Sequence, residues 1–132
     1  VAGGNMRPGI DQIPGTAMDW HGVQRYFSVS GNEGTVIVAT PDVSLIQVNG
    51  INTGSWMDAL PPHNGTVMSW VMNNYWNTNF PAGQGGPVRY LYSLSFSPDK
   101  FNSNAAGIFA SAIRQPLVAS LSVDNFSLNP VT

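Results

Sequence analysis

Apolar and polar residues alternate along several short stretches of the chain, which is the pattern of half-buried β-strands. The clearest stretch is 88–97, where five apolar or aromatic residues occupy every second position. They are Val88, Tyr90, Tyr92, Leu94 and Phe96. The pattern predicts that these side chains face the core, so truncation of Tyr92 or Leu94 to alanine should cost about 2 to 5 kcal/mol. Changing Ser93 or Ser95 to alanine should matter little.

Six further stretches have the composition of short strands. They are 23–29, 36–39, 43–48, 67–72, 117–123 and 126–128. Thr40-Pro41-Asp42 suits a tight turn, which predicts a hairpin between 36–39 and 43–48. The stretch 67–72 is apolar on both faces, so we expect a second layer or a neighbouring domain to cover it. The sequence therefore predicts an all-β protein, an antiparallel β-sandwich of about seven strands in one domain spanning 1–132.

One short helix interrupts the strand pattern near 102–112. Its predicted apolar stripe recurs at helical spacing and consists of Phe101, Ala105, Ile108, Phe109 and Ala112. Asp99 or Asn102 can cap the helix, and Pro116 prevents its continuation. We expect the helix to cover an edge or an open end of the sandwich.

The composition of the chain indicates one globular domain and argues against some classes of binding partner. The 132 residues are 42% hydrophobic and only 9% charged, which suits one packed globular domain. The net charge of -2 offers no footprint for nucleic acid or anionic lipid, so neither partner is expected. Without cysteine, the chain has no disulfide framework and no thiolate metal site. Its neutral polar composition favours an extracellular or periplasmic location, although the compartment stays unknown, and its beginning suggests a fragment of a longer protein.

Neither metal nor nucleophilic chemistry has a convincing set of residues. His21 and His63 lie far apart in the sequence without an acidic cluster, so we expect no metal site and no cofactor. The seven carboxylates mostly accompany turn residues. They are Asp11, Asp19, Glu33, Asp42, Asp58, Asp99 and Asp124. Asp19 is the least turn-like, and a structural salt bridge is its favoured role. No catalytic residue is predicted.

The richest candidate for ligand binding is the segment 72–87, which places two adjacent aromatic residues among side-chain amides and glycines. Aromatic rings stack on the apolar face of a sugar while amides bind its hydroxyls. The predicted carbohydrate-binding residues are Asn74, Tyr75, Trp76, Asn77, Asn79 and Gln84. Alternatively, both aromatic residues are buried and the asparagines cap turns. The exposure of Trp76 and Trp56 distinguishes these interpretations.

The same segment carries a resemblance to a known family. The run from Val71 to Phe80, followed by Gln84-Gly85-Gly86-Pro87, resembles the C-terminal region of glycoside hydrolase family 38, the retaining α-mannosidases. Upstream, 11–15, 19–25 and 44–51 agree in order, so the resemblance covers roughly residues 7 to 128. The chain departs from the pattern at Asn49-Gly50, where Gly-Gly is expected, and at His21, where an aromatic residue is common.

The resemblance implies a β-sandwich from the C-terminal β-region of such an enzyme. In that family the zinc ligands and the aspartate nucleophile belong to a separate catalytic domain, and no stretch here matches those motifs. We therefore expect a non-catalytic accessory domain, with the catalytic domain of the same parent chain as partner and zinc bound only by that domain. The alternative is a carbohydrate-binding module for mannose-containing saccharides; a self-sufficient enzyme ranks last.

Overall fold

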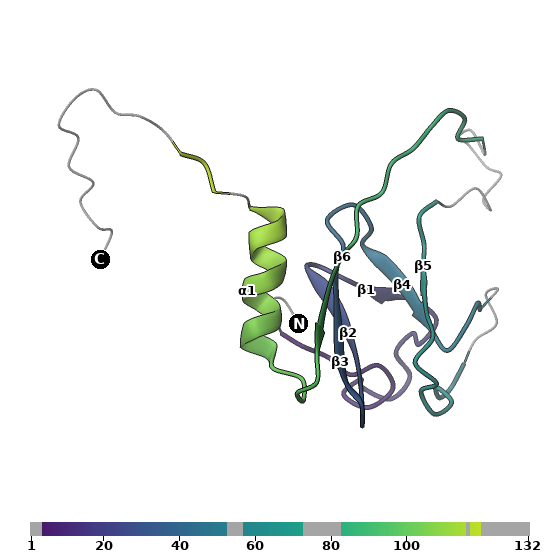
Figure 1. Ribbon diagram of the computed structural model, residues 1–132. Helices are drawn as coiled ribbons and strands as arrows, with labels where there is room; N and C mark the ends of the chain where they lie inside the picture. Colours follow the sequence, from purple (N-terminus) through teal and green to yellow (C-terminus); the bar gives the residue numbers. More distant parts are fainter. Residues whose placement is uncertain (1–3, 53–56, 73–82, 116, 120–132) are drawn as a thin grey trace, which may run out of the picture.

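The protein consists mainly of two antiparallel three-stranded sheets and one short helix, as shown by a computed structural model that describes residues 4–52, 57–72, 83–115 and 117–119 (Figure 1). Sheet I has the order β1-β4-β5, with bounds His21–Gly22, Leu45–Val48 and Val67–Ser69. Sheet II has the order β2-β3-β6, with bounds Tyr26–Gly31, Gly34–Ala39 and Ser93–Ser97. Helix α1, Ser103–Arg114, follows β6.

Strands β2 and β3 form a hairpin whose turn is Asn32-Glu33. Their register runs from Tyr26 opposite Ala39 to Gly31 opposite Gly34. Gly34 has a φ of +134°, and a Cβ there would lie only 3.0 Å from the Cα of Pro98 and closer still to a backbone oxygen. The end of this hairpin therefore requires glycine at position 34.

The predicted hairpin between 36–39 and 43–48 is wrong, because these stretches belong to different sheets. Strand β3 pairs with β2 and β6, whereas β4 pairs with β1 and β5. Two residues of the connection are buried, whereas Asp42 and Ser44 are exposed: Thr40 is 2% and Val43 3% exposed, and the hydroxyl of Thr40 donates to the carbonyl of Val43. The chain thus passes from one sheet to the other through a short connection that the Thr40–Val43 bond holds in place.

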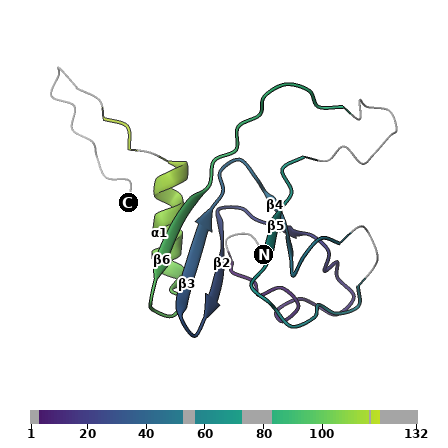
Figure 2. The same ribbon diagram turned by 45° about the vertical axis from the view of Figure 1, so that its right-hand side comes forward.

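Helix α1 packs on the face of sheet II that contains the buried side chains of Thr35, Ile37 and Ala39 (Figure 2). Asn102 caps it, as its side-chain oxygen accepts from two backbone N–H groups at 3.0 Å. The helix itself and this cap were predicted, and the structure confirms both. Small side chains form the contact, since Ala106 and Ala110 are completely buried.

The predicted apolar stripe of α1 is wrong. Ile108 is 65% exposed, and Phe101, Ala105 and Ala112 are also exposed, while Phe109 is half-buried. Two alanines let the helix approach the sheet closely, which the larger side chains of the predicted stripe would prevent. The face with the smaller residues therefore became the buried one.

Strand β6 is shorter than predicted. Its serine face is the more buried one, whereas the sequence predicted that its apolar face would be buried. It covers only Ser93–Ser97, and Leu94 and Phe96 are 54% and 73% exposed. Ser95 lies opposite Ile37 and is half-buried on the side of α1. Alternation was predicted correctly, but the faces are reversed: the serines are on the side of α1, and the helix itself packs mainly on β3 and β2. The expected cost of truncating Leu94 is therefore wrong.

The remaining predicted strands form only in part. Val67–Ser69 is paired as β5, whereas 70–72 is not in a strand. Residues 117–119 are not in a strand either, and 120–128 lies outside the described residues. Six strands are present in the described part of the chain, against about seven expected. No helix among the described residues is long and apolar enough to cross a membrane.

Candidate functional site

Two extended segments, 70–72 and 83–92, lead away from the sheets and flank residues 73–82 (Figures 1 and 2). We call these two segments the arm. Side chains join the arm at its base: the hydroxyls of Ser69 and Tyr92 lie 2.7 Å apart. One step further out, the hydroxyl of Tyr90 donates to the carbonyl of Val71 at 2.7 Å. The two segments thus run antiparallel and are held by side-chain hydrogen bonds.

The base of the arm is anchored to both sheets. The backbone N–H of Trp70 donates to the carbonyl of Leu45 in β4 at 2.9 Å. The backbone N–H of Leu91 donates to the carboxylate of Asp42, just beyond β3, at 2.7 Å. The carboxylate of Asp42 therefore positions the arm, whereas the sequence assigned it to a local hairpin turn.

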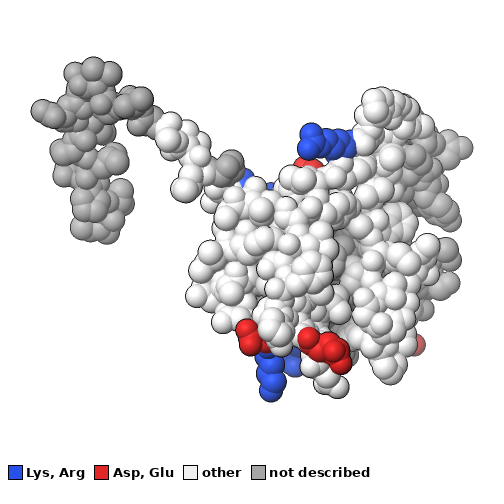
Figure 3. Space-filling view, in the orientation of Figure 1, with Lys and Arg blue, Asp and Glu red and all other residues white. Residues whose placement is uncertain are grey.

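The arm exposes apolar side chains to solvent. Four large apolar residues of the arm are more than a third exposed: Val71, Met72, Val88 and Leu91. Met68 and Leu45 on the adjoining strands are exposed to a similar degree. Charged side chains are sparse in the view of Figure 3 and gather near its upper and lower ends. Arg89 of the arm is also exposed, so the apolar residues flank one charge. Several exposed apolar residues close together are typical of a surface that another protein unit covers.

Five of the six predicted sugar-binding residues, Asn74, Tyr75, Trp76, Asn77 and Asn79, lie outside the described residues, as does Trp56. The sixth, Gln84, is exposed. Their role in binding a saccharide stays a prediction, and only the two segments that flank most of them have a described position.

A pair of aromatic rings at the base of the arm was not singled out from the sequence. The rings of Trp20 and Trp70 meet edge to face, with centroids 5.7 Å apart and planes at 68°. Both residues are half-buried. The available signal was the position of each tryptophan beside a stretch that forms an outer strand of sheet I, since β1 and β5 both pair with the central strand β4.

A buried polar cluster lies beside sheet I. Gln47 is 1% exposed, and its amide bonds both backbone groups of Asn52, at 3.0 and 3.1 Å. The side-chain amide of Asn52 in turn donates to the buried carboxylate of Asp19. Asp19 thus has an amide partner, where the sequence favoured a cationic one. The cluster fixes the chain at Asn52 and satisfies polar groups that burial would otherwise penalise.

His21 belongs to the same buried region. Burial lowers the pKa of its imidazole, the positive charge of His63 lowers it further, and the Met18 backbone and Asp19 raise it. Among the described atoms, its Nε2 has no hydrogen-bond partner. His63 is exposed, and its Nε2 lies 3.0 Å from the carbonyl oxygen of Pro8. The fold brings the two histidines near each other, yet the described residues contain no group of three or more metal-ligating side chains.

Two of the remaining carboxylates make local contacts. Asp11 forms an ion pair with Arg7 at 2.7 Å, and the side-chain hydrogen bond from Arg7 contributes most to lowering the pKa of Asp11 to about 2. Asp99 accepts from the hydroxyl of Ser97 at 3.2 Å. Both contacts link residues at most four positions apart, so they close turns and do not place two carboxyl groups across a substrate.

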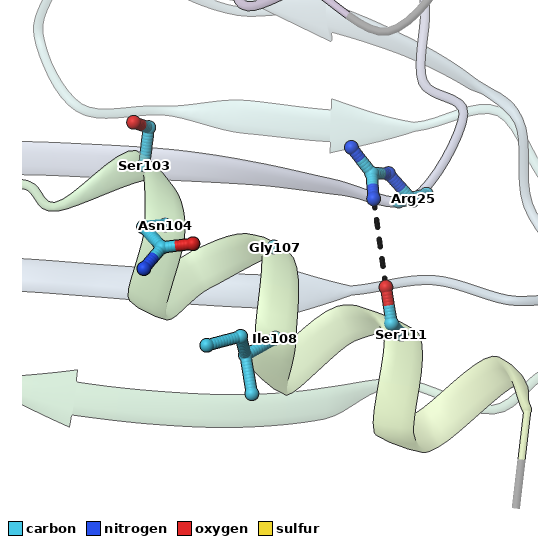
Figure 4. Close-up of a pocket in the computed structure, with 6 residues that line it drawn as sticks. All are labelled: Arg25, Ser103, Asn104, Gly107, Ile108 and Ser111. Carbon is cyan, nitrogen blue, oxygen red and sulfur yellow. Dashed lines mark hydrogen bonds between the residues drawn. The ribbon is translucent and has the colours of Figure 1, made fainter. Parts of the chain in front are cut away.

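A shallow hollow of about 430 Å³ lies between β2 and α1 (Figure 4). It is lined by Arg25, Ser103, Asn104, Gly107, Ile108 and Ser111. The guanidinium of Arg25 reaches across it to the hydroxyl of Ser111 at 3.5 Å. This lining combines one positive charge with neutral side chains and includes no carboxylate or histidine, so it offers weak polar contacts and no acid–base pair.

Comparisons of the chain with protein-family models, with curated proteins and with solved structures each find no match.

Proposed function

We propose that this chain is a non-catalytic accessory β-sandwich domain of an α-mannosidase-like glycoside hydrolase, and that its arm packs against another domain of the same parent chain. The observation that carries the proposal is the exposure of four large apolar residues on the arm: Val71, Met72, Val88 and Leu91. Packing of a second domain on these residues is favourable because it removes apolar surface from water.

Two contacts between the sheets support the sandwich arrangement. The Ser69–Tyr92 bond joins the last residue of β5 to the residue that precedes β6. In addition, Gly65 approaches Val29 of β2, since a Cβ at Gly65 would lie 3.9 Å from the Val29 side chain. These contacts support an arrangement in which sheet I lies beside the face of sheet II that is opposite α1.

The non-catalytic role is supported by how the carboxylates are used. Asp19 accepts from Asn52, Asp42 accepts from the arm, and Asp99 accepts from Ser97. Each of these three carboxylates holds a segment of the fold. A glycosidase of the retaining type needs two carboxyl groups about 5 Å apart that face a sugar.

The docking role is tested by binding between the tagged chain and the polypeptide encoded upstream of its Val1. We expect binding, and we expect Met72→Asp or Val88→Asp to weaken it by at least about tenfold, because a charge would be buried at the contact. Ile108→Asp is the matched control, since this exposed residue lies on α1 and should not affect binding. Equal binding by all variants would contradict the proposed surface, and the absence of an α-mannosidase-type domain upstream would contradict the proposed parent.

The activity is tested separately with aryl α-mannosides. The purified chain should release no product, with or without added zinc. Zinc-dependent turnover that disappears in His21→Ala or His63→Ala would overturn the non-catalytic role.

The alternative function is a carbohydrate-binding module. It is supported by the composition of the segment 72–87, which combines Tyr75 and Trp76 with side-chain amides, and by the exposure of Gln84. Mannose oligomers should then bind with a dissociation constant of about millimolar to micromolar, as expected for a small contact. Calorimetry would measure the affinity, and Trp76→Ala should abolish it. Binding that is unchanged in this variant would exclude the aromatic residue as the contact.

A further inference from the structure

We propose that β6 is a dimerisation edge, through which two copies of this chain pair their Ser93–Ser97 strands antiparallel about a two-fold axis at Ser95. In sheet II, β6 is the edge strand and β3 is its neighbour; within the described ranges nothing pairs with its other side. An edge strand presents unpaired backbone N–H and C=O groups, which are a template for another strand.

The apolar side chains on one face of sheet II continue across the sheet as far as β6, and at this edge they are exposed to solvent. Two rows of side chains cross the sheet in register, first Phe27, Val38 and Leu94, and then Val29, Val36 and Phe96. The members on β2 and β3 are half-buried, whereas Leu94 and Phe96 on β6 are 54% and 73% exposed. Each row therefore ends in its most exposed residue. One more strand with apolar side chains on this face would cover both.

Strand β6 carries none of the features that usually protect an edge. Its sequence is Ser93-Leu94-Ser95-Phe96-Ser97, with no charged residue and no proline. Natural edge strands commonly have a lysine, a proline or a bulge that prevents such pairing. A neutral strand of alternating serine and apolar residues is able to pair with a copy of itself without bringing like charges together.

The strand's own pattern sets the register. With the axis at Ser95, all five residues of β6 pair, and Leu94 of each copy lies opposite Phe96 of the other. Cross-strand apolar pairs of this kind stabilise a sheet. If the pairing continued beyond β6, Asp99 would lie opposite Leu91 of the second copy and Lys100 opposite its Tyr90. No charged residue would face another of the same sign.

This interface differs from the arm, so it does not depend on the proposed docking to a catalytic domain. A two-fold contact uses the same strand from both copies and closes on itself, giving a dimer rather than a fibre. It would join two three-stranded sheets into one sheet that continues from the first copy into the second.

The first test is the molar mass of the purified chain, measured by light scattering and sedimentation over a range of concentrations. We expect a monomer–dimer equilibrium. Phe96→Lys should raise the dissociation constant by more than about tenfold, because it buries a charge opposite an apolar side chain. Ile108→Lys, at a similarly exposed position on α1, should leave the equilibrium unchanged. Circular dichroism checks that both variants fold. A monomer at every concentration would overturn the proposal.

The second test locates the axis. The chain has no cysteine, so Ser95→Cys introduces one thiol per copy, and directly opposite positions in paired strands lie about 5 Å apart. A short bifunctional maleimide should therefore crosslink this variant into a dimer. Asn32→Cys, at the turn between β2 and β3, should not crosslink. If both variants crosslink equally, or if the β6 amides that point away from β3 resist hydrogen exchange in a monomer, then β6 is not the contact between copies.

Discussion

The hydroxyl of Tyr92 lies 2.7 Å from the hydroxyl of Ser69, and this bond joins the two sheets where the arm begins. Ser69 ends β5 in sheet I, and Tyr92 precedes β6 in sheet II. The bond links residues that are far apart along the chain. It therefore sets how the end of one sheet lies relative to the start of the other.

Removal of this hydroxyl should weaken the whole fold. Tyr92→Phe is expected to lower the free energy of unfolding by about 1 kcal/mol, the usual net value of one such hydrogen bond. Urea unfolding followed by tryptophan fluorescence measures the change. Tyr90→Phe is the matched control, because its lost bond to Val71 lies further out along the arm and should affect stability less. Equal losses would mean that the link between the sheets has no special role.

The two faces of sheet II should respond differently to truncation. Ile37→Ala removes a buried side chain beneath α1 and should cost about 2 to 4 kcal/mol. Leu94→Ala removes one that is mostly in solvent and should cost less than about 1 kcal/mol at protein concentrations too low for association. Denaturant titrations of the two variants make the comparison. A larger loss for Leu94→Ala would place the core on the other side of the sheet.

The turn between β2 and β3 should tolerate alanine at one end only. Gly34→Ala forces a positive φ on alanine and a close approach to Pro98, so it should destabilise by about 1 to 3 kcal/mol. Gly31→Ala has nothing within 4 Å of the added Cβ and should change stability by less than about 1 kcal/mol. Thermal unfolding of both variants compares their losses of stability. Equal losses would mean that the β2–β3 hairpin has another register.

Stability should fall on mild acidification because of His21. Burial lowers the pKa of its imidazole in the folded protein below the ordinary value of 6.5, so the unfolded chain binds the proton more readily. The contribution is fully present above pH 6.5 and decreases as the pH falls from there toward the folded pKa. Urea midpoints between pH 7.5 and 5 measure the loss. His21→Gln should reduce this dependence, and His63→Gln should retain most of it; the reverse result would assign the effect to His63.

Local patterns predicted the elements better than their pairing. The run Val36 to Ala39 is a strand, and Asn102 caps a helix, because β-branched residues and side-chain caps act through their immediate neighbours. Thr40-Pro41-Asp42 looked like a hairpin turn for the same local reason. Whether the chain turns back or crosses to another sheet depends on distant partners such as β6, and no local pattern specifies those.

The candidate site shows the same division. The sequence predicted a binding role for the aromatic and amide residues of the segment 72–87, and this stays a prediction; of these residues the structure describes Gln84, which is exposed. It did not identify the apolar arm, because exposure depends on what packs nearby. It also paired Asp19 with a cation, whereas the fold brings Asn52 to it from a loop thirty-three positions away.

The sequence by itself determined that the chain is mostly β with one short helix, since period-two alternation, turn residues and a cap are properties of neighbouring positions. Only the tertiary structure decided which face of each element is buried. Ala106 and Ala110 are completely buried where α1 packs on β3 and β2, because small side chains allow a close approach. Leu94 and Phe96 consequently lie on the opposite face, at an edge that the rest of the described chain leaves exposed.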